Sequence, residues 1–273
     1  MIGAIAGDIC GSRFERRSHK SKDFELFASS CRFTDDTVMS LAVAQALLDC
    51  GEAGFGGLGQ AAVRRMRQLG RSYPDAGYDG RFTRWLLAKQ PHPYGSFGNG
   101  SAMRVSACSW AACSLEEALQ LAEQASAVTH NHPEGVKGAQ AAAAALYLAR
   151  TGAGKDEIRA YLQRNFYLLD FTLDEIREAY RFDSSCQGSV PQALEAFLEA
   201  ESFEDVLRLA VSIGGDSDTI AAIAGSVAEA YFGVPDNIRK QAESYLSGEL
   251  LEILRRFEAV YPPEKKCGAD GED

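Results

Sequence analysis

The sequence has no long hydrophobic run and almost no stretch in which β-branched and polar residues alternate. No apolar segment approaches the roughly 20 residues that a membrane-spanning helix needs, and the first residues include no basic region of the kind that opens a secretory signal. These absences disfavour a membrane protein, a secreted protein and a sheet protein. We therefore expect a cytoplasmic, helical chain that does not bind membranes.

Zinc-binding cysteine patterns are also missing. The chain has 7 cysteines, an odd number, and they include no CxxC pair or other zinc spacing. Cys10, Cys108 and Cys113 lie among small apolar residues, where a reduced thiol acts as a small hydrophobic group. We therefore expect reduced cysteines and a reducing compartment.

Basic residues are scarce relative to acidic ones. The chain has 28 Lys and Arg against 38 Asp and Glu, which gives a formal net charge of -10 and a pI of about 5.0. Such a chain has no long-range attraction for a phosphate backbone or an anionic membrane, so general nucleic-acid binding is not expected. An anionic ligand can still be held locally by backbone N–H groups and metal ions.

What the sequence does contain is helical periodicity along most of its 273 residues. Apolar residues recur every three to four positions, as on the buried face of a helix, and Gly or Pro residues separate the segments. The periodic segments are 38–48, 115–128, 139–148, 193–198, 206–213, 220–232 and 242–257. The pattern predicts one all-α domain over residues 1–261. The polar residues 262–273 predict a flexible tail.

Two acidic clusters each precede a helical segment: TDDT at 34–37 and DSDT at 216–219. Taken alone, each is typical of a helix N-cap, where hydroxyls and carboxylates bind free backbone N–H groups. Hard cations such as Mg²⁺ and Mn²⁺ prefer the same oxygen ligands. If the clusters met in space, two divalent cations would balance their carboxylates, which solvent alone would tolerate poorly.

A glycine-rich loop, YGSFGNGSAMR at 94–104, leads into a further helical segment. Glycine lets backbone N–H groups approach a phosphate, the following helix N-terminus adds a positive dipole end, and Phe97 can stack on a ring. The loop lacks the Walker spacing and the preceding strand of a dinucleotide fingerprint. An ordinary surface connection is the alternative.

His130 lies where one helical segment ends and the next begins. His130 and His132 are two positions apart, so they lack the spacing of a helical zinc site. We interpret His130 as a neutral residue that hydrogen-bonds a ligand hydroxyl or phosphate, with a structural role at a helix junction as the alternative. By themselves, Asp8 and Glu15 are typical of a turn and of a solvated charge.

Taken together and in this order, these segments resemble the ADP-ribosylglycohydrolase family. The segments are GAIAGDICGSRFE, FTDDTVMSLAVAQALL, YGSFGNGSAMRV, SAVTHNHPEGVKGA and IGGDSDTIAAIAGSVAEAYFG. The resemblance covers about residues 1–235. It implies a compact, orthogonal all-α domain with a centre of two Mg²⁺ or Mn²⁺ ions.

The resemblance also implies roles for individual residues. It assigns one cation to Thr34, Asp35 and Asp36, and the other to Asp216 and Thr219, with Asp218 bridging both. The catalytic candidates are Glu15, Asp35 and Asp36. The loop that holds the diphosphate and its riboses is Gly95, Ser96, Phe97, Gly98, Asn99 and Gly100, and His130 contacts the ligand. Relatives often carry Tyr where this chain has Phe97, so stacking is kept but a phenolic hydrogen bond is lost.

The implied function is metal-dependent hydrolysis of an ADP-ribosyl N- or O-glycosidic bond, which releases ADP-ribose from a protein, nucleobase or small metabolite. A metal-dependent phosphoester hydrolase and a non-catalytic ADP-ribose-binding or structural member are the alternatives. We expect the loops 54–59, 73–81 and 183–191 to shape the leaving-group side. A monomer is expected.

Overall fold

The computed structural model describes residues 1–51 and 54–263, and within these residues the fold is all-α, as the sequence predicts. The last ten positions of the predicted tail lie outside the described residues. The helices are α1 (Ile2–Gly11), α2 (Asp35–Cys50), α3 (Leu58–Ser72), α4 (Gly80–Leu87), α5 (Ser106–Ala111), α6 (Leu115–Ala127), α7 (Pro133–Arg150), α8 (Lys155–Asn165), α9 (Leu173–Ile176), α10 (Cys186–Glu199), α11 (Phe203–Ser212), α12 (Ser217–Phe232), α13 (Asp236–Ser244) and α14 (Gly248–Val260), with short 3-10 turns η2 (Phe55–Gly57) and η3 (Asn99–Ser101).

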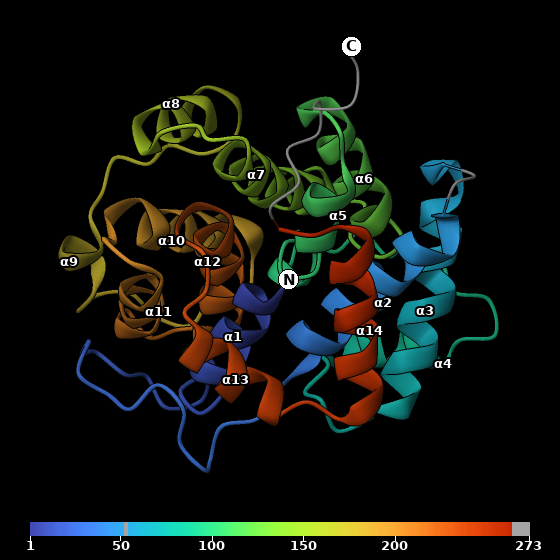
Figure 1. Ribbon diagram of the computed structural model, residues 1–273, viewed down its shortest axis with the longest axis horizontal. Helices are drawn as coiled ribbons and strands as arrows, with labels where there is room; N and C mark the ends of the chain where they lie inside the picture. Colours follow the sequence, from blue (N-terminus) through green and yellow to red (C-terminus); the bar gives the residue numbers. More distant parts are fainter. Residues whose placement is uncertain (52–53, 264–273) are drawn as a thin grey trace.

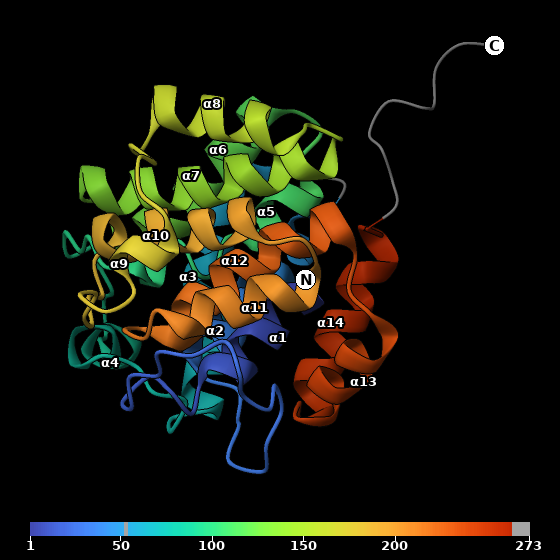
Figure 2. The same cartoon turned by 90° about the vertical axis from the view of Figure 1, so that its left-hand side faces the viewer.

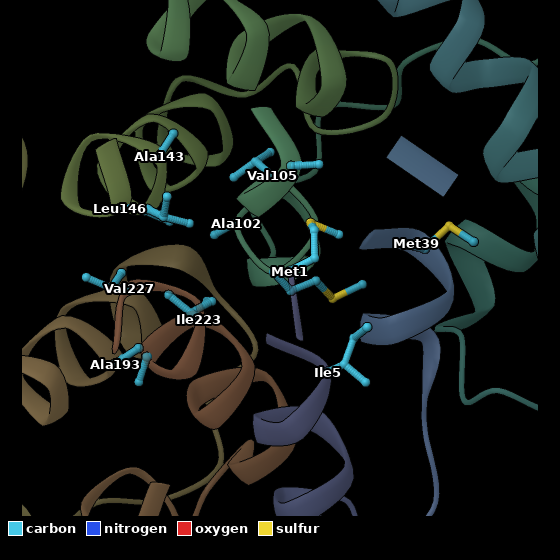
Figure 3. Close-up of a cluster of buried hydrophobic side chains, with 14 of the residues drawn as sticks. Met1, Ile5, Met39, Ala102, Val105, Ala143, Leu146, Ala193, Ile223 and Val227 are labelled. Carbon is cyan, nitrogen blue, oxygen red and sulfur yellow. The ribbon is translucent and has the colours of Figure 1, made fainter. Parts of the chain in front are cut away.

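The N-terminal helix α1 occupies the middle of the molecule. It contacts α12 on one side and α2 on the other (Figure 1). Figure 2 shows α7 and α8 stacked over the layer that contains α10, α11 and α12. Buried side chains from α1, α2, α7, α10 and α12 meet in one apolar core (Figure 3). The core therefore fixes the two helices that carry the acidic clusters against the same central element.

Two sequence expectations about local structure were wrong. The segment 242–257 is not one helix, because α13 ends at Ser244 and α14 begins after Ser247. The Ser247 hydroxyl accepts a hydrogen bond from Leu250 N at 3.3 Å, so it caps a new helix in place of continuing the old one. Cys10 and Cys108 are buried free thiols as expected, whereas Cys113 is exposed.

The described part of the chain offers no helix with the length and apolar character that crossing a membrane requires.

Glycines allow α1 and α12 to approach almost backbone to backbone. Gly3, Gly7 and Gly11 are four residues apart and lie on one face of α1. A Cβ atom at Gly7 would lie 2.0 Å from the carbonyl oxygen of Ala221, and one at Gly11 would lie 2.4 Å from that of Ser217. A side chain at Gly7 or Gly11 would push away the N-terminal part of α12, which carries the second acidic cluster.

We predict that Gly7→Ala lowers the free energy of unfolding by about 2–3 kcal/mol, because the new methyl group meets rigid backbone and the helices must separate. Urea denaturation followed by circular dichroism measures this change. Gly248→Ala is the matched control, since a Cβ there has nothing within 4 Å. Equal stability of the two variants would contradict the close packing of α1 against α12.

Candidate active site

The two acidic clusters, far apart in sequence, meet at α1. TDDT forms the N-terminal end of α2, and DSDT forms that of α12. One carboxylate oxygen from each of Asp8, Asp36 and Asp218 lies within 4.8 Å of the other two, and all three residues are buried. The structure thus brings together the clusters whose meeting in space the sequence left open.

Asp8 on α1 organises the first cluster. Its carboxylate accepts hydrogen bonds from Thr34 N at 2.9 Å, Thr37 N at 3.1 Å and the hydroxyl of Thr34 at 2.7 Å, and from the hydroxyl of Thr37. Asp8 therefore caps the N-terminus of α2 from a different helix. Asp8 was not among the site residues predicted from the sequence. The one available signal was a carboxylate inside an otherwise apolar, glycine-spaced helix.

The remaining carboxylates differ in the hydrogen bonds that their oxygens accept. Asp36 is 3% exposed; its Oδ2 accepts from the Thr219 hydroxyl at 3.2 Å, whereas its buried Oδ1 has no partner among the described residues. Asp218 is 5% exposed and accepts from the backbone N–H of Thr219. Asp216 accepts from the side-chain amide of Asn99 at 2.7 Å, which links the cluster to the glycine-rich loop.

Burial and mutual repulsion disfavour the ionised form of these groups. Burial raises the pKa of Asp36 and Asp218 well above the usual value, and the neighbouring carboxylates raise both further. Burial, followed by the charge of Asp8, raises the pKa of Asp35 to about 8. A cation near these oxygens would return them to the charged form. The unsatisfied Asp36 oxygen and the all-oxygen donor set fit a hard divalent cation.

A cavity of about 650 Å³ opens over the acidic cluster. Asp36 and Asp218 line its floor, and the glycine-rich loop and His130 line another part of its wall. The predicted site residues in its lining are Glu15, Asp35, Asp36, Ser96, Phe97, Gly98, Asn99, Gly100, His130, Asp216, Asp218 and Thr219. Thr34 lies behind the lining in contact with Asp8, and Gly95 donates its N–H to Asn131.

The glycine-rich loop is bound to the segment that precedes α10. Asn99 N donates to the carbonyl of Ser184 at 2.8 Å, and Cys186 N donates to that of Phe97 at 2.9 Å. The side chain of Phe97 is 46% exposed and meets the ring of His132 edge-on at 5.4 Å. The loop is therefore held at its backbone while the ring of Phe97 is partly exposed in the cavity lining.

Glu15 reaches the cavity from the irregular segment between α1 and α2. Its carboxyl is half-buried, and burial, followed by the charge of Asp216, raises its pKa. Lys20 anchors the same segment: its ammonium group donates to the carbonyl oxygens of Arg177, Tyr180 and Ile213. Glu15 thus lies near the acidic cluster on a segment that is fixed in part to Ile213, three residues before Asp216.

Two of the three loops expected to shape the leaving-group side do line the cavity. Tyr78, Asp79 and Arg81 contribute from around the start of α4, and Asp183, Ser184 and Ser185 from the segment before α10. The prediction for the loop 54–59 was wrong, because none of its residues is in the lining. Phe82 and Phe182 also line the cavity, and no sequence pattern marked them.

Comparison with known proteins places this geometry in context. The family model for ADP-ribosylglycohydrolase matches residues 1–265. Human ADP-ribosylhydrolase ARH3 is 27% identical, with 92% of this chain and 90% of the relative covered. ADP-ribosylarginine hydrolase Tri1 of Pseudomonas putida (strain GB-1) is 30% identical over 93% of this chain and 76% of the relative. A solved ADP-ribosylglycohydrolase-related protein complex shares the fold, with a TM-score of 0.67, 24% identity and 97% of both chains covered.

The site geometry predicts that Asp218→Asn stabilises the protein when EDTA is present. A carboxyl whose pKa is raised by folding costs stability as the pH rises above its unfolded value, here 3.8, towards its folded value. At about pH 8 we expect a gain of about 1–3 kcal/mol in the free energy of unfolding, which is the usual cost of a buried polar group that lacks a partner. The gain should shrink as the pH falls towards about 3, below the unfolded value, where the carboxyl is mostly protonated in both states.

Urea unfolding at the two pH values measures this difference, and adding Mn²⁺ supplies the control. The cation should stabilise the wild type more than Asp218→Asn, because the variant lacks one of the charges that the cation balances. A variant that is less stable than the wild type in EDTA at the higher pH would contradict the electrostatic account of the cluster.

Proposed function

The chain belongs to the ADP-ribosylglycohydrolase family, and from that membership we propose that it uses two Mg²⁺ or Mn²⁺ ions to hydrolyse a glycosidic bond between ADP-ribose and a carrier. The matched relatives are named as hydrolases of ADP-ribosyl linkages. The observation that carries the metal dependence is the buried carboxylate cluster with its unpartnered Asp36 oxygen. The cavity above it has a volume typical of a small-molecule site.

The donor set supports two neighbouring cations. One would be held by Thr34, Asp35 and Asp36 and the other by Asp216 and Thr219, with Asp218 bridging both. When bound, the cations would act as Lewis acids and as a template that orients sugar hydroxyls. Asp8 already accepts four hydrogen bonds, so its role would be to hold the first group of ligands in place.

The opposite wall supports binding of the ADP-ribosyl group itself. The backbone of the glycine-rich loop, 95–100, would approach the diphosphate, because glycine removes the side chains that otherwise keep a phosphate away. His130 would donate a hydrogen bond to the same region. The exposed ring of Phe97 would stack on a flat part of the ligand.

Bond cleavage at the anomeric carbon builds positive charge on the ribose ring. The carboxylates of Asp35 and Asp36, which face the cavity, would stabilise that charge. Glu15 would move the proton, to the leaving group or from the attacking water, because a carboxyl with a raised pKa suits proton transfer near neutral pH.

We expect Asp36→Ala and Asp218→Ala to lower the rate of ADP-ribose release at least about 100-fold, because each removes a ligand that faces the reacting sugar. The assay follows free ADP-ribose from proteins, nucleic acids and small metabolites that carry it, with Mg²⁺ or Mn²⁺ and then with EDTA. Asp170→Ala, at an exposed position outside the cavity lining, is the control.

The products separate this proposal from its alternatives. Release of AMP or inorganic phosphate would identify a phosphoester hydrolase instead. Tight binding of ADP-ribose without release from any carrier would identify a binding protein. Release that persists at the wild-type rate in both variants with metal present would contradict the proposed site.

A second expectation concerns Phe97. Phe97→Ala should weaken binding of free ADP-ribose by about threefold to tenfold, which corresponds to the usual value of one aromatic contact. Phe97→Tyr keeps the ring and should bind as tightly as the wild type or more tightly. Isothermal titration calorimetry measures both affinities. Unchanged affinity in Phe97→Ala would show that this ring does not touch the ligand.

A further inference from the structure

His130 presents one ring nitrogen to the cavity and the other to the protein interior. The residue is 4% exposed, and its Nδ1 lies 2.7 Å from the hydroxyl oxygen of Thr129. Its Nε2 faces the backbone of the glycine-rich loop: a Cβ atom at Gly100 would lie 3.2 Å away, and one at Gly98 3.6 Å away. Nε2 has no hydrogen-bond partner within the described residues. The tautomer of His130 therefore decides whether the cavity faces a donor or an acceptor.

The partner of Nδ1 is itself bound to a buried cation. Arg104 is 1% exposed, and its guanidinium group donates to the hydroxyl oxygen of Thr129 at 2.7 Å. It also donates to the carbonyl oxygens of Gly100 at 2.9 Å, Ser126 at 3.1 Å and Ala125 at 3.2 Å. One side chain thus contacts both the glycine-rich loop and the residue that controls the histidine.

Two acceptors lie within hydrogen-bond distance of the Thr129 hydroxyl group. His130 Nδ1 is 2.7 Å away, whereas the carbonyl oxygen of Ser126 is 3.4 Å away, at the limit of a hydrogen bond. A hydroxyl that accepts from a guanidinium group becomes a stronger donor. The positive charge of Arg104 also favours a lone pair, rather than an N–H, on the side of the ring that points towards it.

We propose that Arg104 and Thr129 are positioning residues that fix His130 as the tautomer with its proton on Nε2. The cavity then faces an N–H donor beside the glycine-rich loop, suited to an anionic oxygen of the ligand's diphosphate. This inference rests on the proposed function for the identity of that ligand. The tautomer itself follows from the contacts within the protein.

In its neutral form, His130 with its proton on Nε2 donates a hydrogen bond only towards the cavity. Burial, followed by the charges of Arg104 and Arg81, lowers the pKa of His130 well below its usual value, so the ring is uncharged at neutral pH. An imidazolium would donate from Nδ1 as well and would break the hydrogen bond from Thr129. The buried arginine therefore holds the ring both neutral and in one orientation.

Nitrogen-15 NMR of the full chain with labelled histidine tests the assignment directly. A protonated ring nitrogen and an unprotonated one have distinct chemical shifts, and the spectrum of His130→Asn identifies the signals of His130. We expect Nε2 protonated and Nδ1 unprotonated in the wild type. A wild-type spectrum with Nδ1 protonated overturns the inference, whatever the behaviour of any variant.

Thr129→Val removes the hydroxyl at nearly constant shape, and Thr129→Ser restores it as the matched control. Thr129→Val should show a mixture of tautomers and bind free ADP-ribose about threefold to tenfold more weakly, while Thr129→Ser should match the wild type in both measurements. A purely structural role of Thr129 would leave the tautomer unchanged, and that result would overturn the inference. Loss of hydrolysis in the wild type with the Nε2 tautomer present would count against the proposed function alone.

Discussion

The hydrogen bonds between the carboxylate of Asp8 and the N-terminus of α2 are the interaction on which the arrangement of the site depends. Through them α1 holds the TDDT cluster on one side, while its glycine face admits the DSDT cluster at the start of α12 on the other. Both clusters therefore occupy helix N-termini, where free N–H groups and the helix dipole partly stabilise negative charge. Packing against α1 thus holds two acidic helix ends close together despite the mutual repulsion of their carboxylates.

This arrangement places function in conflict with stability. The helix ends stabilise only part of the charge on the buried carboxylates, as the raised pKa values of Asp36 and Asp218 show. If only stability mattered, neutral residues would be favoured at these positions, because an unpaired buried charge is costly. Bound cations would provide the missing charge in the proposed site. The proposed affinity for cations would then have the same physical origin as the cost of the cluster without them.

Much of the fold and of the acidic site can be predicted from the sequence, because helical periodicity and short motifs are local signals. The TDDT and DSDT clusters, the glycine-rich loop and His130 meet in one cavity as the resemblance implied. Asp8 could not be assigned, because its partners Thr34 and Thr37 lie more than twenty residues away in sequence. The break after Ser244 was missed because a serine cap inside an apolar pattern does not interrupt the periodicity.

If the cluster of Asp8, Asp36 and Asp218 forms part of the proposed site, the chain should bind divalent cations in a fixed ratio. Titration with Mn²⁺, with the free ion counted by electron paramagnetic resonance, measures that ratio. We expect saturation at two ions per chain in the wild type and at fewer than two in Asp36→Asn. Absence of saturable binding in the wild type, or the same number of ions in the variant, would contradict the proposed cation site.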